Sequence, residues 1–198
     1  MSNTIKSVAV FCGSASGESP IYREAATAMG HLLADRGIQL VYGGGNIGLM
    51  GIIAEAVLEK SGKVIGVIPK SLENKELAHM GLTDLRIVES MHERKALMAD
   101  LSDGFIAMPG GFGTLDELCE ILTWAQLSFH SKPIGLLNIN GFFDPLLLMF
   151  DHAIREGFLK PDHIQLVSVA REPEAILHKL ESAEPLNEEK WWSDKGKV

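Results

Sequence analysis

The stretch Pro109-Gly110-Gly111-Phe112-Gly113-Thr114-Leu115-Asp116-Glu117 decides the fold of this chain. The apolar run 105–108 before it is typical of a buried strand, and apolar residues recur with helical spacing over 115–129. A strand therefore ends, a glycine-rich turn follows, and a helix begins. Such a turn directs free backbone N–H groups and the positive end of the helix dipole at one place, which favours phosphate binding.

Two interpretations of Glu117 are open from the residues alone. Thr114 and Glu117 fit the S/T-x-x-E capping box, in which the glutamate reaches back to the N-cap amide and no ligand is needed. Alternatively, Glu117 lies one helical turn beyond a bound phosphate and takes part in chemistry. The glycine run favours the second interpretation, because glycine lets the backbone approach an anion and an ordinary cap does not need such a run.

Composition indicates one globular domain with a full hydrophobic core. The chain has 198 residues, of which 46% are hydrophobic and 22% charged, as is usual for globular proteins. Its net charge of -8 argues against non-specific binding to nucleic acid or to an anionic membrane. No apolar stretch approaches the roughly 18 residues of a membrane span, and the N-terminus lacks a signal-peptide layout. We therefore expect a cytoplasmic protein.

Cysteine and histidine spacings give no sign of a metal centre. Cys12 and Cys119 fall in predicted core elements without C-x-x-C spacing, so we expect buried, reduced thiols, with a disulfide left open. The seven histidines show no H-x-x-x-H or H-E-x-x-H spacing. We therefore expect neither a metal ion nor a cofactor.

Strand and helix patterns alternate along the chain. Strands are predicted at 8–11, 38–42, 63–68, 85–88, 105–108, 134–139 and 164–169. Helices are predicted at 21–36, 47–60, 91–101, 115–129, 144–156 and 173–180. This order predicts an α/β fold, a single doubly wound Rossmann-like domain over 1–180, with a parallel sheet covered by helices on both faces. The apolar run 146–150 suits a helix buried on two sides or at a dimer interface, and 181–198 is a polar tail containing Trp191 and Trp192.

Three turns rich in glycine or serine, at 13–17, 43–48 and 110–114, follow predicted strands. Ligands of doubly wound sheets bind outside the carboxyl ends of the strands, so the turns indicate a phosphate-bearing ligand of nucleotide size. Gly43-x-Gly45-x-x-Gly48 matches the dinucleotide fingerprint G-x-G-x-x-G. However, it follows the second strand, and the next strand ends in Ile-Pro-Lys at 68–70 rather than in the expected acidic residue. A nicotinamide or flavin dinucleotide is therefore disfavoured.

The charged run 91–95, Met-His-Glu-Arg-Lys, opens the helix that precedes the glycine strand. Arg94 or Lys95 can thus face the turn at 110–114, although charged runs more often form a solvated face. Adjacent helical side chains diverge, so we do not expect both to contact one atom. Glu120 lies one turn beyond Glu117 and is expected to point to solvent.

Taken together, 91–95 and 109–117 resemble the LONELY GUY (LOG) family of cytokinin riboside 5′-monophosphate phosphoribohydrolases. The family signature is P-G-G-x-G-T-x-x-E with an upstream Arg-Lys pair, and both match without a gap. The segments 11–14 and 122–126 are also similar, so the resemblance extends over about residues 5 to 180. Many members were once labelled lysine decarboxylases, but no site for a pyridoxal Schiff-base lysine is recognisable here.

The resemblance implies a catalytic pair, Arg94 and Glu117, and a nucleotide site that needs no metal. Substrate-binding residues in this interpretation are Ser14, Gly44, Gly45, Glu76, Lys95, Gly110, Gly111, Gly113, Thr114 and Thr123. The implied reaction is hydrolysis of N6-substituted adenosine 5′-monophosphates, with AMP a further candidate substrate, by a homodimer. The alternative is a non-enzymatic nucleotide or molybdenum-cofactor carrier of the same fold, which needs the phosphate turn but not Arg94 with Glu117.

Overall fold

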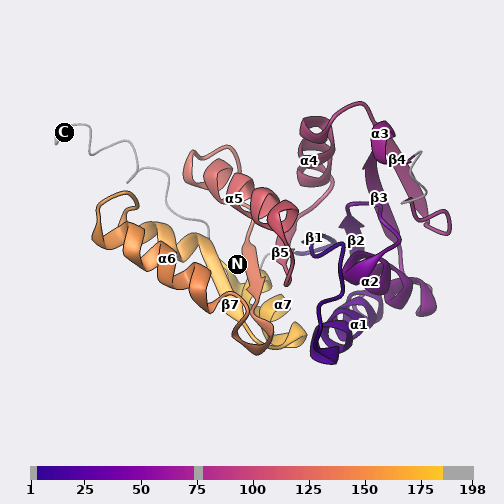
Figure 1. Cartoon of the computed structure of the whole chain (residues 1–198), viewed down its shortest axis with the longest axis horizontal. Coiled ribbons are helices and arrows are strands. Elements are labelled where there is room, and N and C mark those ends of the chain that lie inside the picture. Colours follow the sequence, from indigo (N-terminus) through magenta and orange to yellow (C-terminus); the bar gives the residue numbers. More distant parts are fainter. Residues whose placement is uncertain (1–3, 74–77, 185–198) are drawn as a thin grey trace.

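A seven-stranded parallel sheet forms the middle layer of the computed structural model, which describes residues 4–73 and 78–184 (Figure 1). The strand order is β4-β3-β2-β1-β5-β6-β7. The strands are β1 (Ser7–Phe11), β2 (Gln39–Tyr42), β3 (Val64–Pro69), β4 (Asp84–Val88), β5 (Gly104–Ala107), β6 (Ile134–Leu137) and β7 (Val167–Ala170). The helices are α1 (Pro20–Asp35), α2 (Gly48–Glu59), α3 (Lys70–Leu72), α4 (Met91–Asp100), α5 (Phe112–Gln126), α6 (Asp144–Arg155) and α7 (Pro173–Ser182).

Helices cover both faces of the sheet, as the sequence predicts. Alternate residues of β1 show the division, since Val8 and Val10 pack in the cluster that contains α1, α2 and α7. Ala9 and Phe11 pack in the opposite cluster, with α4, α5 and the start of α6. Central strands buried on both faces carry apolar residues almost without interruption, which explains the short apolar runs of the sequence.

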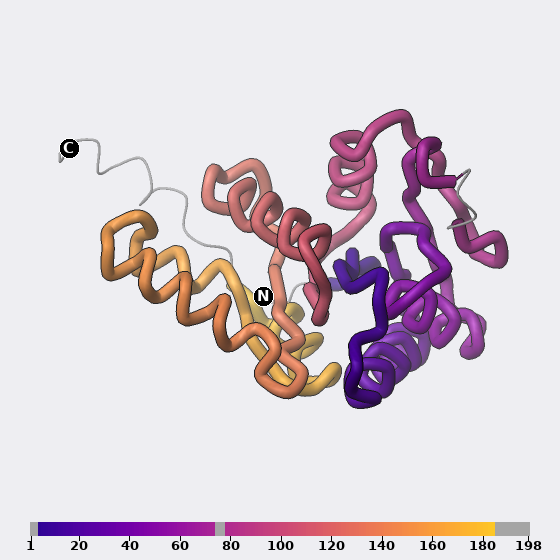
Figure 2. The backbone as a smooth tube through the Cα atoms, viewed as in Figure 1, coloured from indigo at the N-terminus to yellow at the C-terminus, as the bar shows by residue number. Residues whose placement is uncertain are grey.

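The two halves of the chain meet between β1 and β5. Residues of the first half build β1 to β4 in one direction, and the chain then crosses to β5 and continues outward to β7. Ala9 is the shared neighbour, opposite Val41 of β2 and Phe105 of β5. In Figure 2 the indigo-to-magenta half of the chain lies mainly on one side of this seam and the orange-to-yellow half mainly on the other. In such folds the seam is the point at which ligands bind.

Two predicted strands are too long. The run 134–139 is a strand only over β6, and a 3-10 turn, Ile139–Gly141, follows it. The run 164–169 is divided between a 3-10 segment, Pro161–Leu166, and β7. A short apolar run fits a buried turn as well as a strand, so the pattern did not distinguish them.

Two burial predictions are wrong within the single chain. The prediction that 146–150 lies in a helix buried on two sides fails, because α6 has no buried residue; Leu148 and Met149 are 66% and 58% exposed. Of the two cysteines, Cys12 is buried but Cys119 is exposed, and both are free thiols. Helical spacing identifies an apolar side but not whether the same chain covers it. Trp191 and Trp192 lie outside the described residues.

Candidate active site

Backbone hydrogen bonds of Gly13, in the first glycine turn, reach the residue before the third turn and the residue after the second turn. The Gly13 N–H donates to the Pro109 carbonyl at 3.0 Å, and the Gly13 carbonyl accepts the Leu49 N–H at 3.0 Å. The prediction that the three turns share one edge is therefore confirmed. A crevice of about 250 Å³ opens there, between the turn 13–17 and Pro109, Gly110 and Gly111.

Two aromatic residues that the motifs did not reveal, Tyr22 and Phe142, also line this crevice. Their rings meet edge to face, with centroids 6.1 Å apart. Tyr22 comes from the first turn of α1 and Phe142 from the loop after β6, so they are brought together from distant parts of the sequence. Only the position of each residue just after a strand and its turn could have indicated them.

The turn after β5 starts its helix earlier than the sequence suggests. Gly111 is the N-cap of α5 and no side chain caps it. Thr114 is therefore a buried residue within the first turn, 3% exposed, and not a cap. The capping-box interpretation fails for this reason, and Glu117 faces α4 instead. A Cβ at Gly111 would meet nothing within 4 Å, so its backbone is open to a ligand.

Arg94 and Glu117 form a buried ion pair across α4 and α5. Arg94 Nη1 lies 3.0 Å from Glu117 Oε1, and the two side chains are only 10% and 8% exposed. The Arg94 Nε–H also donates to the Val67 carbonyl at 3.1 Å, which holds the guanidinium against β3. Removing two charges from water is costly, so a buried ion pair is weak evidence for a stabilising role. Its place beside the glycine turns is better explained by chemistry.

Burial and the Arg94 charge act in opposite directions on the pKa of Glu117. Burial raises the pKa of its carboxyl, and the Arg94 guanidinium partly counteracts this by lowering the same pKa. Burial also raises the pKa of the neighbouring Cys12 thiol, and the Glu117 carboxylate adds to that effect. Cys12 therefore stays protonated, and nucleophilic thiolate chemistry is not supported.

Lys95 diverges from Arg94, as predicted for adjacent helical positions. Its ammonium lies 3.0 Å from Asp116 and 3.1 Å from Glu120, both on α5. Burial by itself would lower the pKa of Lys95, but the two carboxylates offset this and raise it. The prediction that Glu120 points to solvent is wrong, because Lys95 holds it at the α4–α5 contact.

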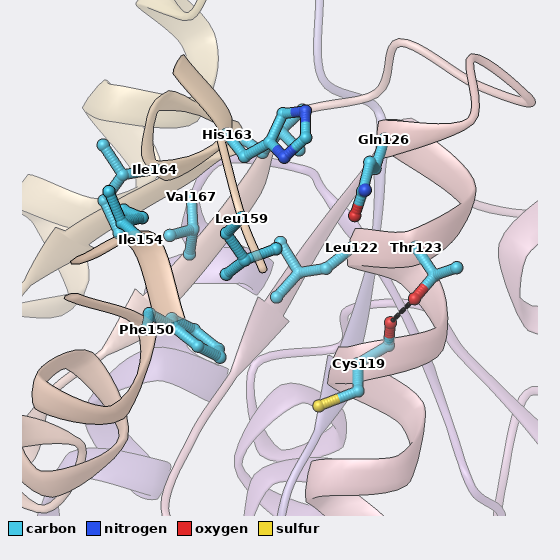
Figure 3. A pocket seen from close by; sticks show the side chains of 11 residues that line it. Cys119, Leu122, Thr123, Gln126, Phe150, Ile154, Leu159, His163, Ile164 and Val167 are labelled. Carbon is cyan, nitrogen blue, oxygen red and sulfur yellow. Dashed lines mark hydrogen bonds between the residues drawn. The ribbon is translucent and has the colours of Figure 1, made fainter. Parts of the chain in front are cut away.

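Thr123 lies in a different place from the Arg94–Glu117 pair. Its hydroxyl donates to the Cys119 carbonyl at 2.7 Å, and both residues line an apolar pocket between α5 and α6 (Figure 3). Ser14, Gly44 and Gly45 lie in the first two turns, Ser14 exposed and both glycines buried. Glu76 is outside the described residues.

Within the described ranges, no group of three or more His, Cys, Asp or Glu side chains is placed to hold a metal ion. In the same part of the chain no helix has the length and apolarity to cross a membrane.

The fold and the joined turns define the class of protein. It is a Rossmann-like protein with a glycine-lined crevice at the seam.

Comparison with known sequences shows the family. The family model described as "Possible lysine decarboxylase" matches residues 50–180. The cytokinin riboside 5′-monophosphate phosphoribohydrolase LOG of Oryza sativa subsp. japonica is 49% identical over 178 residues, 90% of this chain and 74% of that protein. The cytokinin riboside 5′-monophosphate phosphoribohydrolase LOG7 of Arabidopsis thaliana is 47% identical over 180 residues, 91% of this chain and 83% of that protein. The chain therefore belongs to the LOG family, and the resemblance found in the sequence is confirmed.

Solved structures support the fold. The molybdenum cofactor binding protein of Rippkaea orientalis has a TM-score of 0.68 at 24% identity, covering 89% of this chain and 95% of that one. The molybdenum cofactor carrier protein of Chlamydomonas reinhardtii has a TM-score of 0.64 at 21% identity, covering 88% and 96%. At these identities the similarity concerns the fold alone.

Proposed function

We propose that the protein hydrolyses the N-glycosidic bond of N6-substituted adenosine 5′-monophosphates, giving the free base and ribose 5-phosphate. The observation that carries the proposal is the buried Arg94–Glu117 pair on the helices beside the glycine turn. The names of relatives 47% to 49% identical support the same reaction. A carrier needs the turn but has no use for a buried acid paired with arginine.

The 5′-phosphate is proposed to bind at the N-terminus of α5. Backbone N–H groups of the first helical turn have no intrahelical partner, and the helix dipole adds positive potential there. Gly111 and Gly113 leave this backbone open, since a Cβ at either position would meet nothing within 4 Å. Ser14 borders the crevice from the first turn.

Glu117 is proposed to act on the sugar. Cleavage of an N-glycosidic bond builds positive charge on the ribose, as in glycoside hydrolysis. An ionised carboxylate stabilises that charge and orients or deprotonates the attacking water. Burial and the bound phosphate both oppose ionisation of Glu117, whereas Arg94 favours it. The proposed role of Arg94 is therefore to keep Glu117 charged.

The remaining features of the proposal concern assembly and setting. A homodimer is supported by the exposed apolar residues of α6 and by the apolar pocket beside it (Figure 3). Free nucleotides rather than nucleic acid are the proposed substrates, in keeping with the net charge of -8. The two free thiols are in keeping with a reducing cytoplasm.

A substrate comparison tests the proposal. The purified protein is incubated with isopentenyladenosine monophosphate, AMP and the two matching nucleosides, and the free base is quantified by chromatography. We expect release from the monophosphates but not from the nucleosides, because the phosphate anchors the substrate. Tight nucleotide binding without release of base from any of them would instead support a carrier.

A further inference from the structure

His79 is a buried histidine with a partner on each ring nitrogen. It is 5% exposed, and its Nε2 lies 2.8 Å from Glu55 Oε1 of α2. Its Nδ1 accepts the Gly81 N–H at 3.2 Å, so the ring proton of the neutral imidazole is on Nε2 and is donated to Glu55. The ring therefore ties α2 to the segment 78–81 that leads into β4.

The backbone of the same segment is fastened to the second glycine turn. The His79 N–H donates to the Gly44 carbonyl at 2.9 Å, and Ala78 forms an antiparallel bridge with Gly45. Because α2 begins directly after this turn, His79 contacts two consecutive elements. Its ring binds Glu55 of α2, and its backbone N–H binds Gly44 of the turn.

The second turn in turn supports Arg94. A Cβ at Gly43 would collide with the Arg94 guanidinium, so the guanidinium rests directly on the backbone of the turn. The next residue of the turn, Gly44, has a φ of +73° and packs against Ile68 and Leu85. A displacement of this turn therefore changes the surface on which the guanidinium lies.

We propose that His79 is a positioning residue that, braced by Glu55, holds the second glycine turn against Arg94 and so sets the Arg94–Glu117 pair for catalysis. The inference rests on the proposed hydrolysis. It predicts an effect on kcat rather than on KM, because the proposed phosphate site at α5 is built by a different turn.

The structure offers a matched control. His31 and Glu59 form a second histidine–glutamate pair between α1 and α2, at 3.1 Å and one helical turn further along α2. This pair is more exposed than His79, with side-chain exposures of 34% and 64%, and its ion pair joins α1 to α2 rather than to the segment 78–81. His31→Ala should thus leave kcat and KM unchanged.

The experiment measures kcat, KM and thermal midpoint for the full-length wild type, His79→Ala and His31→Ala with isopentenyladenosine monophosphate. We expect His79→Ala to lower kcat per folded molecule about 10- to 100-fold, as small misplacements of catalytic groups do, while KM changes less than about twofold. His79→Gln keeps an amide donor for Glu55, and His79→Asn keeps an acceptor for Gly81. Each should restore part of kcat, and these milder variants carry the test if His79→Ala does not fold.

The outcomes separate the possible failures. If the wild type releases no base, the proposed function is wrong and the inference falls with it. If the wild type is active and the His79 variants lose thermal stability at unchanged kcat, His79 is merely structural. A rise in KM at constant kcat would also overturn the inference, because the turn would then serve binding rather than Arg94. Glu55→Ala should reproduce His79→Asn, since both remove the same hydrogen bond, and the double variant should add little to either.

Discussion

Glu117 owes its environment to the residue at which α5 begins. With Gly111 as N-cap, Thr114 is inside the helix and Glu117 reaches Arg94 on α4. The sequence supplied the two residues and their motif, but not the burial of the pair or the contact of Lys95 with Glu120. Both depend on how closely α4 packs against α5, which no local pattern encodes.

Replacing Glu117 by Gln should strongly lower turnover while nucleotide binding is kept. The amide preserves the shape of the side chain but cannot supply a negative charge or accept a proton. We expect kcat to fall by roughly 10²- to 10⁴-fold, the usual contribution of a general acid or base. Single-turnover assays and calorimetric titration with AMP separate the two effects, and Glu59→Gln, on the exposed side of α2, serves as the control. A near-normal rate would remove Glu117 from the mechanism.

The pH dependence should show the raised pKa of Glu117. In the proposed mechanism the Glu117 carboxylate acts in its ionised form, and burial raises its pKa above the ordinary value of 4.5. Activity is therefore lost as the pH falls through this raised pKa, so the acid limb of kcat/KM should lie above pH 4.5. A profile from pH 4 to 8 checks the sign. An acid limb at or below 4.5 would show that Arg94 outweighs burial.

At the scale of elements, two adjacent glycines in the turn before α5 should respond differently to alanine. A Cβ at Gly110 would strike Thr114 and the Gly13 backbone, whereas one at Gly111 meets nothing. Gly110→Ala should therefore lower the free energy of unfolding by about 1–3 kcal/mol, the usual cost of overpacking. Gly111→Ala should fold normally but raise KM tenfold or more, because its methyl group would occupy the open space beside the turn and keep the phosphate from the backbone N–H groups. A hydrogen bond to a charged group contributes roughly 1.5–3 kcal/mol.

Denaturant unfolding and steady-state kinetics on both variants test this contrast. If Gly111→Ala binds substrate as well as the wild type does, the phosphate does not lie against that backbone, and the proposed phosphate site would have to move. The wild-type KM for AMP provides the reference.

Elements with strong periodicity or glycine boundaries were predictable, and exposed apolar surface was not. The strands β1, β2 and β5 match their apolar runs because both faces of a central strand are buried. The pattern wrongly predicted a strand over 164–166 and a buried helix at α6. Apolar residues in these two segments line a pocket or face solvent within one chain. Cys119 was misplaced for the same reason.

At the scale of the whole molecule, α6 should form part of a subunit contact. Leu148 and Met149 are large, apolar and exposed. Phe150 and Ile154 of the same helix line the apolar pocket against α5 (Figure 3). We expect a dimer for the wild type and a shift toward monomer for Leu148→Glu, because a charge buried in an interface is costly. Sedimentation velocity measures both. Ala28→Glu, at an exposed position of α1, is the control.

Either a monomeric wild type or an unchanged dimer in Leu148→Glu would contradict this assignment of the interface. The fold class, the shared edge of the three turns and the two residues of the Arg94–Glu117 pair could be predicted from the sequence. For the apolar run 146–150 the sequence left a buried helix and a dimer interface open, because a local pattern does not show which apolar side chains the chain itself leaves uncovered.

The seam between β1 and β5 has a consequence for how the molecule holds together. The strands on one side of it come from the first half of the chain and those on the other side from the second. A nucleotide in the crevice would contact turns from both halves of the chain and so hold the two halves together. By linkage, a ligand at 100 times its dissociation constant stabilises the folded form by about 2.7 kcal/mol. Substrate supply in the cell would then influence how long the protein survives proteolysis as well as how fast it works.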